Sequence, residues 1–212
     1  MSKQLLPIMT ANGSFENLRR GGYVYVDKTA YLHSLVRQEG NMFFLSRPRR
    51  FGKTLTVSTL EAIFQGRREL FKGLVIDSLD YDWEPYPVIH IDFTNCWKKT
   101  ADALDGWLKD RIEEIADSYG VGPLDMAKTS DDLFAKLILL LSKKGKVVVL
   151  VDEYDKVVSD NALGENVGEL REEHCGGFGG MAEESHETGR RILWDCSARP
   201  VPACRRRVLR PD

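Results

Sequence analysis

The stretch NMFFLSRPRRFGKT, residues 41–54, combines residue types that could hold the phosphates of a nucleotide. A short apolar run precedes a loop rich in arginine, and Gly52, Lys53 and Thr54 then open a segment with the apolar spacing of a helix. Backbone N–H groups at a helix N-terminus form a positive site for phosphate. In such a site Gly52 would let the main chain approach the phosphate oxygens, Lys53 would reach the β- and γ-phosphates, and Thr54 would bind Mg²⁺. The stretch therefore predicts a phosphate-binding loop.

This loop matches only part of the usual G-x4-G-K-S/T pattern, because Arg47 stands where that pattern has glycine. The alternative is an ordinary strand-to-helix turn with a surface lysine. The context favours the phosphate loop, since an apolar strand precedes the triplet and a helical pattern follows it. The predicted nucleotide-binding residues are Arg50, Phe51, Gly52, Lys53, Thr54 and Leu55.

A second group of functional residue types follows the apolar run VVVLV, residues 147–151. A continuous aliphatic run is typical of a central parallel strand, and ligands bind outside the carboxyl ends of such strands. Asp152 and Glu153 come directly after this run. Two carboxylates there predict two roles, with Asp152 holding Mg²⁺ and Glu153 polarising the attacking water. The alternative is a strand that simply ends in polar turn residues.

Composition favours a single α/β domain, because the 212 residues are 42% hydrophobic and 29% charged, which suits one sizeable core. The net charge of −2 gives no global reason to expect binding to nucleic acid or to a membrane surface. No segment approaches the roughly 20 apolar residues of a membrane-spanning helix, and the N-terminus lacks a secretory signal. The four cysteines show no disulfide pattern. We therefore expect a cytoplasmic protein.

Hydrophobic periodicity outlines the elements that must position these residues. Residues 1–22 show little periodicity and predict an extended N-terminal segment, and residues 23–26 predict a short strand. Asp27 is placed to cap a helix, His33 has no evident partner, and Asp92 is expected to lie in a cap or turn. The other predicted strands are residues 42–45, 87–93 and 147–151, and the predicted helices follow Asp27, begin at residue 53, and cover residues 103–119 and 133–141.

Three segments together resemble one known family: VDKTAYL near the start, FLSRPRRFGKTL in the phosphate loop and VVVLVDEYDK at the acidic strand. They are similar to the AAA-ATPase-like family of predicted prokaryotic ATP-binding proteins, whose Arg-Pro-Arg-Arg-Phe-Gly-Lys loop would account for Arg47. The resemblance covers residues 6–171 and implies a P-loop NTPase-like three-layer sandwich with a central, mainly parallel sheet. It also implies Lys53 and Thr54 as phosphate and Mg²⁺ ligands, Asp152 as the metal-side acid and Glu153 as the hydrolytic acid.

The resemblance further implies that this chain is truncated. Members of the family continue into a strand ending in a Thr-Gly sensor motif, further helices and a nuclease-like domain of the restriction-endonuclease superfamily, none of which is visible in this sequence. In the additional-strand class of P-loop ATPases, the strand after the acidic one inserts between it and the phosphate-loop strand. Residues 192–196 are the only candidate for that strand, so we expect a sheet that is incomplete at the C-terminus, weak ATP binding and poor hydrolysis.

The last residues, 171–212, differ in composition from the rest of the chain. All 13 lysines lie before residue 157, whereas this tail holds eight arginines and three cysteines. We interpret the tail as disordered or as the product of a reading-frame error near Glu172, which sequencing of the source gene would test. One alternative is a metal site formed by His174, Cys175, His186, Cys196 and Cys204. The spacing of these cysteines fits no zinc pattern, which argues against such a site. Another is a basic nucleic-acid arm, but seven acids nearly cancel its arginines.

The leading hypothesis is an ATP-binding P-loop module over residues 23–170, with Mg²⁺-dependent hydrolysis coupled to a conformational change in a partner or a missing downstream domain. The alternatives are a non-catalytic nucleotide-binding or regulatory domain, and a fragment of a nuclease-associated ATPase. The expected cofactors are ATP and Mg²⁺. The expected partners are the nucleotide and either a second copy of the chain or another protein, without nucleic acid or membrane.

Overall fold

The computed structural model describes residues 6–9, 13–38, 42–46, 50–125, 128–154, 156 and 191–196. The chain forms helices and a parallel sheet and divides into two compact units. The first unit contains Met1–Glu39 and Gly52–Tyr86, and the second unit contains Gly40–Phe51 and Pro87–Asp212. The division falls between Phe51 and Gly52, inside the predicted phosphate loop.

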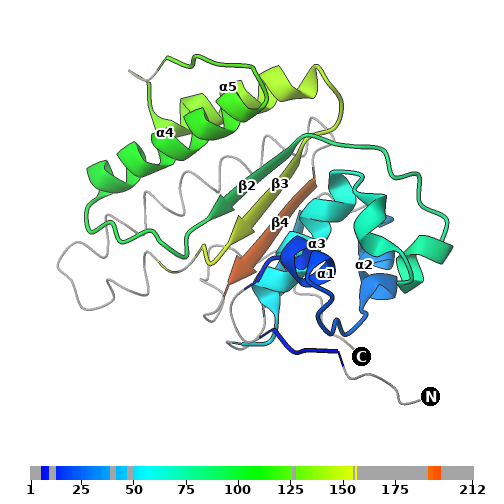
Figure 1. Cartoon of the computed structure of the whole chain (residues 1–212). Helices are drawn as coiled ribbons and strands as arrows, with labels where there is room; N and C mark the ends of the chain where they lie inside the picture. The colour runs from blue at the N-terminus through cyan, green and yellow to red at the C-terminus, as the bar shows by residue number, and fades with distance from the viewer. Residues whose placement is uncertain are drawn as a thin grey trace, which may run out of the picture. The chain divides into compact units, whose positions relative to one another are not determined.

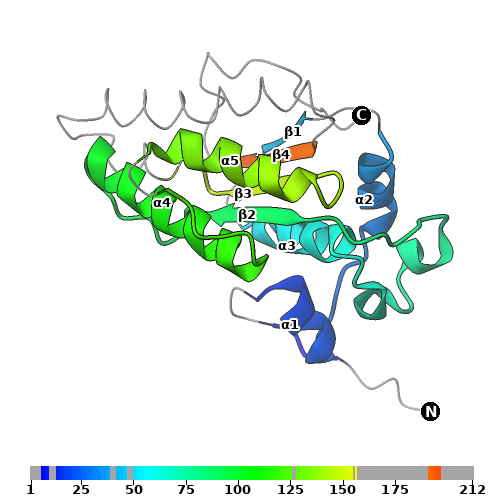
Figure 2. The same cartoon turned by 90° about the horizontal axis from the view of Figure 1, so that it is seen from above.

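The second unit is built on a sheet of four parallel strands: β1 (Met42–Ser46), β2 (Val88–Asp92), β3 (Val148–Asp152) and β4 (Arg191–Cys196). Their order across the sheet is β1-β4-β3-β2, so strands that are distant in sequence are neighbours in space (Figure 2). β3 is buried along its whole length, as expected for a continuous aliphatic run. The predicted α/β fold with a parallel sheet is confirmed.

Two helices of the second unit, α4 (Ala101–Ser118) and α5 (Ser130–Ser142), cover one face of this sheet. Each follows a threonine whose hydroxyl accepts a backbone N–H of the first turn. Their apolar stripes form one core cluster with alternate residues of the two neighbouring strands, namely Ile89, Ile91, Val149 and Val151. Figures 1 and 2 show both helices on the same side of the sheet. The intervening residues of β2 and β3 therefore project from the opposite face.

β4 occupies the position between β1 and β3. Ile192 pairs with Met42 on one side and with Val149 on the other. We expected a gap here unless residues 192–196 filled it, and the structure places Arg191–Cys196 in this position. The candidate segment therefore fills the expected gap, and its parallel pairing satisfies backbone groups on the facing edges of β1 and β3. The predicted metal site and arginine arm of the tail lie largely outside the described residues.

The first unit is helical, with α1 (Phe15–Arg20), α2 (Thr29–Val36), α3 (Lys53–Phe64) and the 3₁₀ helices η1 (Arg68–Phe71) and η2 (Val75–Ser78). Its core contains Phe15, Ile63 and Phe71, each with no exposed surface. The ring centroids of Phe15 and Phe71 lie 4.7 Å apart. This core holds α3, and with it the start of the predicted phosphate-binding helix.

α1 corrects the prediction of an extended segment over residues 1–22. Ser14 caps the helix by accepting the N–H of Asn17, while Phe15 and Leu18 are buried. A helix of six residues is too short to be stable alone, so these tertiary contacts stabilise it. The strand predicted for residues 23–26 is also wrong, because this segment forms no regular element.

Asp27 was predicted to cap α2, but the N-cap residue is Lys28, which supplies no side-chain cap. Asp27 lies one residue earlier, and one of its carboxylate oxygens accepts the N–H of Thr29 at 2.8 Å. Its other oxygen accepts the N–H of Val75 at 2.7 Å, which ties α2 to η2. His33 does have a partner, since its Nε2 atom lies 2.9 Å from the carbonyl oxygen of Asp80.

None of the described helices combines the length and the apolar composition that crossing a membrane requires.

Candidate functional site

The predicted phosphate-binding helix starts where the sequence placed it, with Gly52 as the N-cap and Lys53 as the first residue of α3. Gly52 has a φ of 74°, in the left-handed region that glycine adopts without strain. A Cβ atom at Gly52 would meet no atom of the described residues within 4 Å. The backbone conformation, and not a lack of space, is therefore the reason for glycine at this position. No side chain of the described residues caps α3, in contrast to α4 and α5. The helix start is thus built from main chain, as a phosphate site needs.

The hydroxyl groups of the first turns of α3 differ in their hydrogen bonding. Thr56 donates to the carbonyl oxygen of Gly52 at 2.9 Å, and Thr59 donates to that of Leu55 at 2.6 Å. Thr54 is exposed, and among the residues that the structure describes its hydroxyl has no hydrogen-bond partner. Thr54 is therefore the threonine of this turn whose oxygen is available to a ligand.

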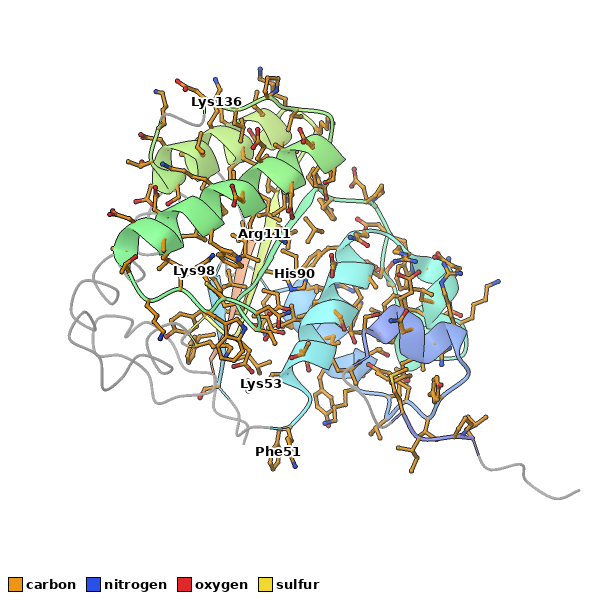
Figure 3. The ribbon with its side chains drawn as sticks, turned by 60° about the vertical axis from the view of Figure 1, so that its left-hand side comes forward. Phe51, Lys53, His90, Lys98, Arg111 and Lys136 are labelled. Carbon is orange, nitrogen blue, oxygen red and sulfur yellow. The ribbon has the colours of Figure 1, made fainter. Side chains whose placement is uncertain are left out.

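Lys53 is 5% exposed, although lysine is among the residues least often buried. Its neighbours in the predicted loop are accessible instead: Arg50 is exposed, and the ring of Phe51 is 61% exposed (Figure 3). Leu55 is half-buried in the first turn of α3. Residues 47–49, which include the Arg47 of the atypical pattern, lie outside the described part of the chain.

The acidic residues belong to the second unit, where Asp152 is the last residue of β3. Asp152 has no exposed surface, and neither of its carboxylate oxygens has a hydrogen-bond partner within the described ranges. Val149 and Val151 point into the core with α4 and α5, so Asp152 projects from the opposite face. A buried carboxylate without hydrogen bonds carries a large desolvation cost, which a bound cation would offset.

Glu153 follows in a strained conformation, with a φ of 53° that residues other than glycine rarely adopt. Its side chain is half-buried, and Tyr154 next to it is buried with its ring 6.2 Å from that of Phe44. Further along, the Lys156 ammonium lies 4.0 Å from the centroid of the Trp97 ring, which joins the loop after β3 to the loop after β2. Backbone strain of this kind is concentrated at functional sites.

One acidic residue of the C-terminal sheet edge was predicted only as a turn residue. Asp92 ends β2 and pairs with Asp152 in the parallel register of β2 and β3. The expected turn is present, because an Asp92 carboxylate oxygen accepts the N–H of Thr94 at 2.8 Å. The position of Asp92 beside Asp152 depends on strand register, which no local pattern in the sequence encodes.

The predicted site residues divide between the two units. Gly52, Lys53, Thr54 and Leu55 belong to the first unit, whereas Arg50, Phe51, Asp152 and Glu153 belong to the second. Their convergence on one ligand stays a prediction.

Oxygen ligands suited to Mg²⁺ are present at two of the predicted positions. The carboxylate of Asp152 and the hydroxyl of Thr54 are both hard donors without a partner among the described residues. No group of three or more histidine, cysteine or acidic side chains in the described ranges could hold a metal ion by itself. Mg²⁺ in nucleotide sites is usually held by one or two carboxylates together with phosphates and water, and each of these two residues, taken within its own unit, is of a type that such a site uses.

Comparison with known proteins connects the sequence of this chain to one family. A sequence model of the family described as "Predicted AAA-ATPase" matches residues 10–181, and the match extends beyond the change of composition at residue 171. The chain is also 38% identical over 165 residues to an uncharacterized protein in the vnfD 5′ region of Azotobacter chroococcum mcd 1. That alignment covers 76% of this chain and 31% of the relative, so the chain spans about a third of the relative's length. A nuclease-like domain beyond this region stays a prediction.

Proposed function

The chain belongs to the AAA-ATPase-like family of predicted AAA-ATPases, and from this premise we propose that it binds ATP with Mg²⁺ and hydrolyses the β–γ phosphoanhydride. We further propose that the fold is the three-layer sandwich of P-loop NTPases. The roles that we propose for individual residues are argued from each unit separately. Energy from hydrolysis would then drive a conformational change in a partner or in a further domain.

The buried carboxylate of Asp152 is the observation that carries this proposal. It ends a parallel strand, at the sheet edge where α/β proteins bind their ligands. With no exposed surface and no hydrogen bond from the described residues, it is best stabilised by a positive charge. A bound Mg²⁺ would neutralise charge that develops on the phosphate oxygens during transfer. Asp152 would hold this ion directly or through a water molecule.

The start of α3 supplies the features of the phosphate side. The left-handed Gly52 turns the chain into the helix, so that the N–H groups of the first turn point outward from its end. Lys53 would place its ammonium against the β- and γ-phosphates, and Thr54 would give its hydroxyl oxygen to Mg²⁺. Arg50 and Phe51 are exposed and therefore accessible to the same nucleotide.

Glu153 is the proposed hydrolytic acid. Its carboxylate would accept a hydrogen bond from the attacking water and orient that water in line with the γ-phosphate. The left-handed backbone at Glu153 changes the direction of the chain immediately after Asp152. The side chains of the two acids are therefore not restricted to opposite faces, as neighbouring residues of a regular strand are. This allows one acid to serve the metal and the other to serve the water.

Titration calorimetry with Mg·ATP and the full chain tests nucleotide binding. Lys53→Ala should weaken binding by at least about tenfold, because it removes charge-assisted hydrogen bonds to phosphate. Lys136→Ala is the matched control, since Lys136 lies on the exposed face of α5 and should leave the affinity unchanged (Figure 3). Equal affinities of the Lys53→Ala and Lys136→Ala variants would contradict the proposed phosphate site.

Hydrolysis is tested by phosphate release under saturating Mg·ATP. Glu153→Gln should bind Mg·ATP with unchanged affinity and lose turnover by about 10² or more, because general acid–base groups contribute about that factor. Glu113→Gln on α4, a half-buried residue without a described partner, serves as the control. If Glu153→Gln binds ATP as the unsubstituted chain does and neither turns over, the chain is a non-catalytic nucleotide-binding domain.

A further inference from the structure

The ends of β2 and β3 place two aspartates side by side. Asp92 pairs with Asp152 in the strand register, and the N–H of Phe93 donates to the carbonyl oxygen of Asp152 at 3.0 Å. The register is therefore fixed up to the last residue of each strand. Figure 1 shows β2 and β3 running side by side in the same direction. Neighbouring strands lie about 4.8 Å apart, so the two aspartates are immediate neighbours at this edge.

Both carboxylates project from the same face of the sheet. Ile91 and Phe93 on either side of Asp92 belong to the core cluster under α4 and α5, as does Val151 next to Asp152. Because side chains alternate along a strand, Asp92 and Asp152 share the opposite face. Like charges on one face of neighbouring strands repel each other, and a cation bound between them removes this repulsion.

The two carboxylates differ in what surrounds them. Asp152 is fully buried, with both oxygens unpartnered among the described residues, whereas Asp92 is exposed. One oxygen of Asp92 accepts the N–H of Thr94, which fixes the orientation of the group, and the second oxygen makes no hydrogen bond that the described residues supply. A buried acid without a partner and an oriented acid beside it are together a ligand pair for a hard cation.

We propose that Asp92 is a second carboxylate ligand of a divalent-cation site shared with Asp152, either by direct coordination or through a bound water. This inference rests on the proposed function in one respect, since Asp152 is its shared ligand. It adds that the cation is held from two strands, so that part of the metal affinity exists before a nucleotide arrives. Asp92 thus serves as a ligand of the cation and takes no part in the proton transfers of hydrolysis.

Titration of the full chain with Mn²⁺ alone, followed by the electron paramagnetic resonance signal of the free ion, tests this site. Asp92→Asn should weaken Mn²⁺ binding by about tenfold or more, as loss of a carboxylate near a metal typically does. The amide oxygen of asparagine can still accept the N–H of Thr94, so this variant keeps the turn and removes only the charge. Asp92→Glu, which keeps a carboxylate, should recover most of the affinity.

Asp110→Asn is the control, because Asp110 is an exposed acid on α4 that should not affect Mn²⁺ binding. If Asp92→Asn binds Mn²⁺ as tightly as Asp110→Asn does, or if the unsubstituted chain does not bind Mn²⁺, the inference is overturned. The proposed function is judged separately by the loss of Mg·ATP binding in Lys53→Ala. Weakened Mn²⁺ binding in Asp92→Asn with no effect of Lys53→Ala would keep the cation site and reject the nucleotide site.

Discussion

Asp152→Asn should make the metal-free protein more stable while weakening its binding of Mg·ATP. The carboxylate has no exposed surface, and the described residues give neither of its oxygens a hydrogen bond. Replacement by the isosteric amide keeps the size of the side chain and removes a charge to which the described residues donate no hydrogen bond. A residue kept for ligand binding at the expense of stability is common in functional sites.

The size of this effect follows from the cost of an unpaired buried group. A buried polar group without a partner costs about 1–3 kcal/mol, and a charged one costs more. The amide remains a buried polar group, so only the additional cost of the charge is recovered, and we expect a gain of about 2 kcal/mol in the free energy of unfolding. For a chain of this length, that corresponds to a rise of about 4–8 °C in the melting temperature.

Thermal unfolding followed by circular dichroism measures this rise in the presence of EDTA. In a second measurement without EDTA, Mg·ATP at about 100 times its Kd should stabilise the unsubstituted chain by about 2.7 kcal/mol and the variant by much less. The order of the two melting temperatures should therefore reverse on addition of the ligand. Asp110→Asn should change neither value by more than about 0.5 kcal/mol. An Asp152→Asn variant that melts at or below the temperature of the unsubstituted chain in EDTA would refute the assignment of an uncompensated charge.

Three further predictions concern the stability of the two units. Phe134→Ala removes a ring with no exposed surface from the cluster under α4 and α5, and should lower the free energy of unfolding in urea by about 3–5 kcal/mol. Gly66→Ala should lower the melting temperature measured by circular dichroism, because Gly66 has a φ of 69° and its new Cβ would lie 2.5 Å from the carbonyl oxygen of Trp83. Hydrogen bonds from Arg67, and then from Arg20, lower the pKa of Glu16 from 4.5 to about 2. The stability that this ionised group contributes is present above pH 4.5 and is lost as the pH falls toward 2, so Glu16→Gln should flatten the pH dependence of the melting temperature in that range.

Each of these substitutions has a matched control in the chain. Leu139→Ala removes an exposed side chain from the same helix as Phe134 and should cost little. Gly106→Ala adds a methyl group in open space within α4 and should stabilise the helix slightly. Glu113→Gln removes a glutamate to which no described residue donates a hydrogen bond, and it is the control for Glu16→Gln. Equal effects in a substitution and its control would contradict the corresponding contact.

The elements with strong periodicity could be predicted from the sequence, because their side chains alone determine which face is buried. The aliphatic run of β3 and the stripe of Leu104, Leu108 and Ile112 on α4 identify a strand and a helix without knowledge of their neighbours. α1 was missed because six residues carry too little pattern, and its stability comes from burial of Phe15 and Leu18. The Ser14 cap was the available signal.

The candidate site could be predicted only as far as local pattern reaches. The start of α3 follows from Gly52 and the apolar spacing after it, and the end of β3 follows from the polar residues after the aliphatic run. Whether Asp152 receives hydrogen bonds depends on the side chains packed around it, and those of the described residues supply none. The position of Asp92 beside it depends on the pairing of β2 with β3. Two helices separate these strands along the chain, so their register is a tertiary property.

The position of β4 also affects how the protein folds while it is being synthesised. The strand between β1 and β3 is the last described one along the chain, so both facing edges remain open on the ribosome until residues 191–196 emerge. Open edges expose N–H and C=O groups that can pair with other nascent chains. Parallel pairing between distant segments is also slow to form. A polypeptide released before residue 191 should therefore aggregate or bind chaperones instead of forming a smaller stable domain.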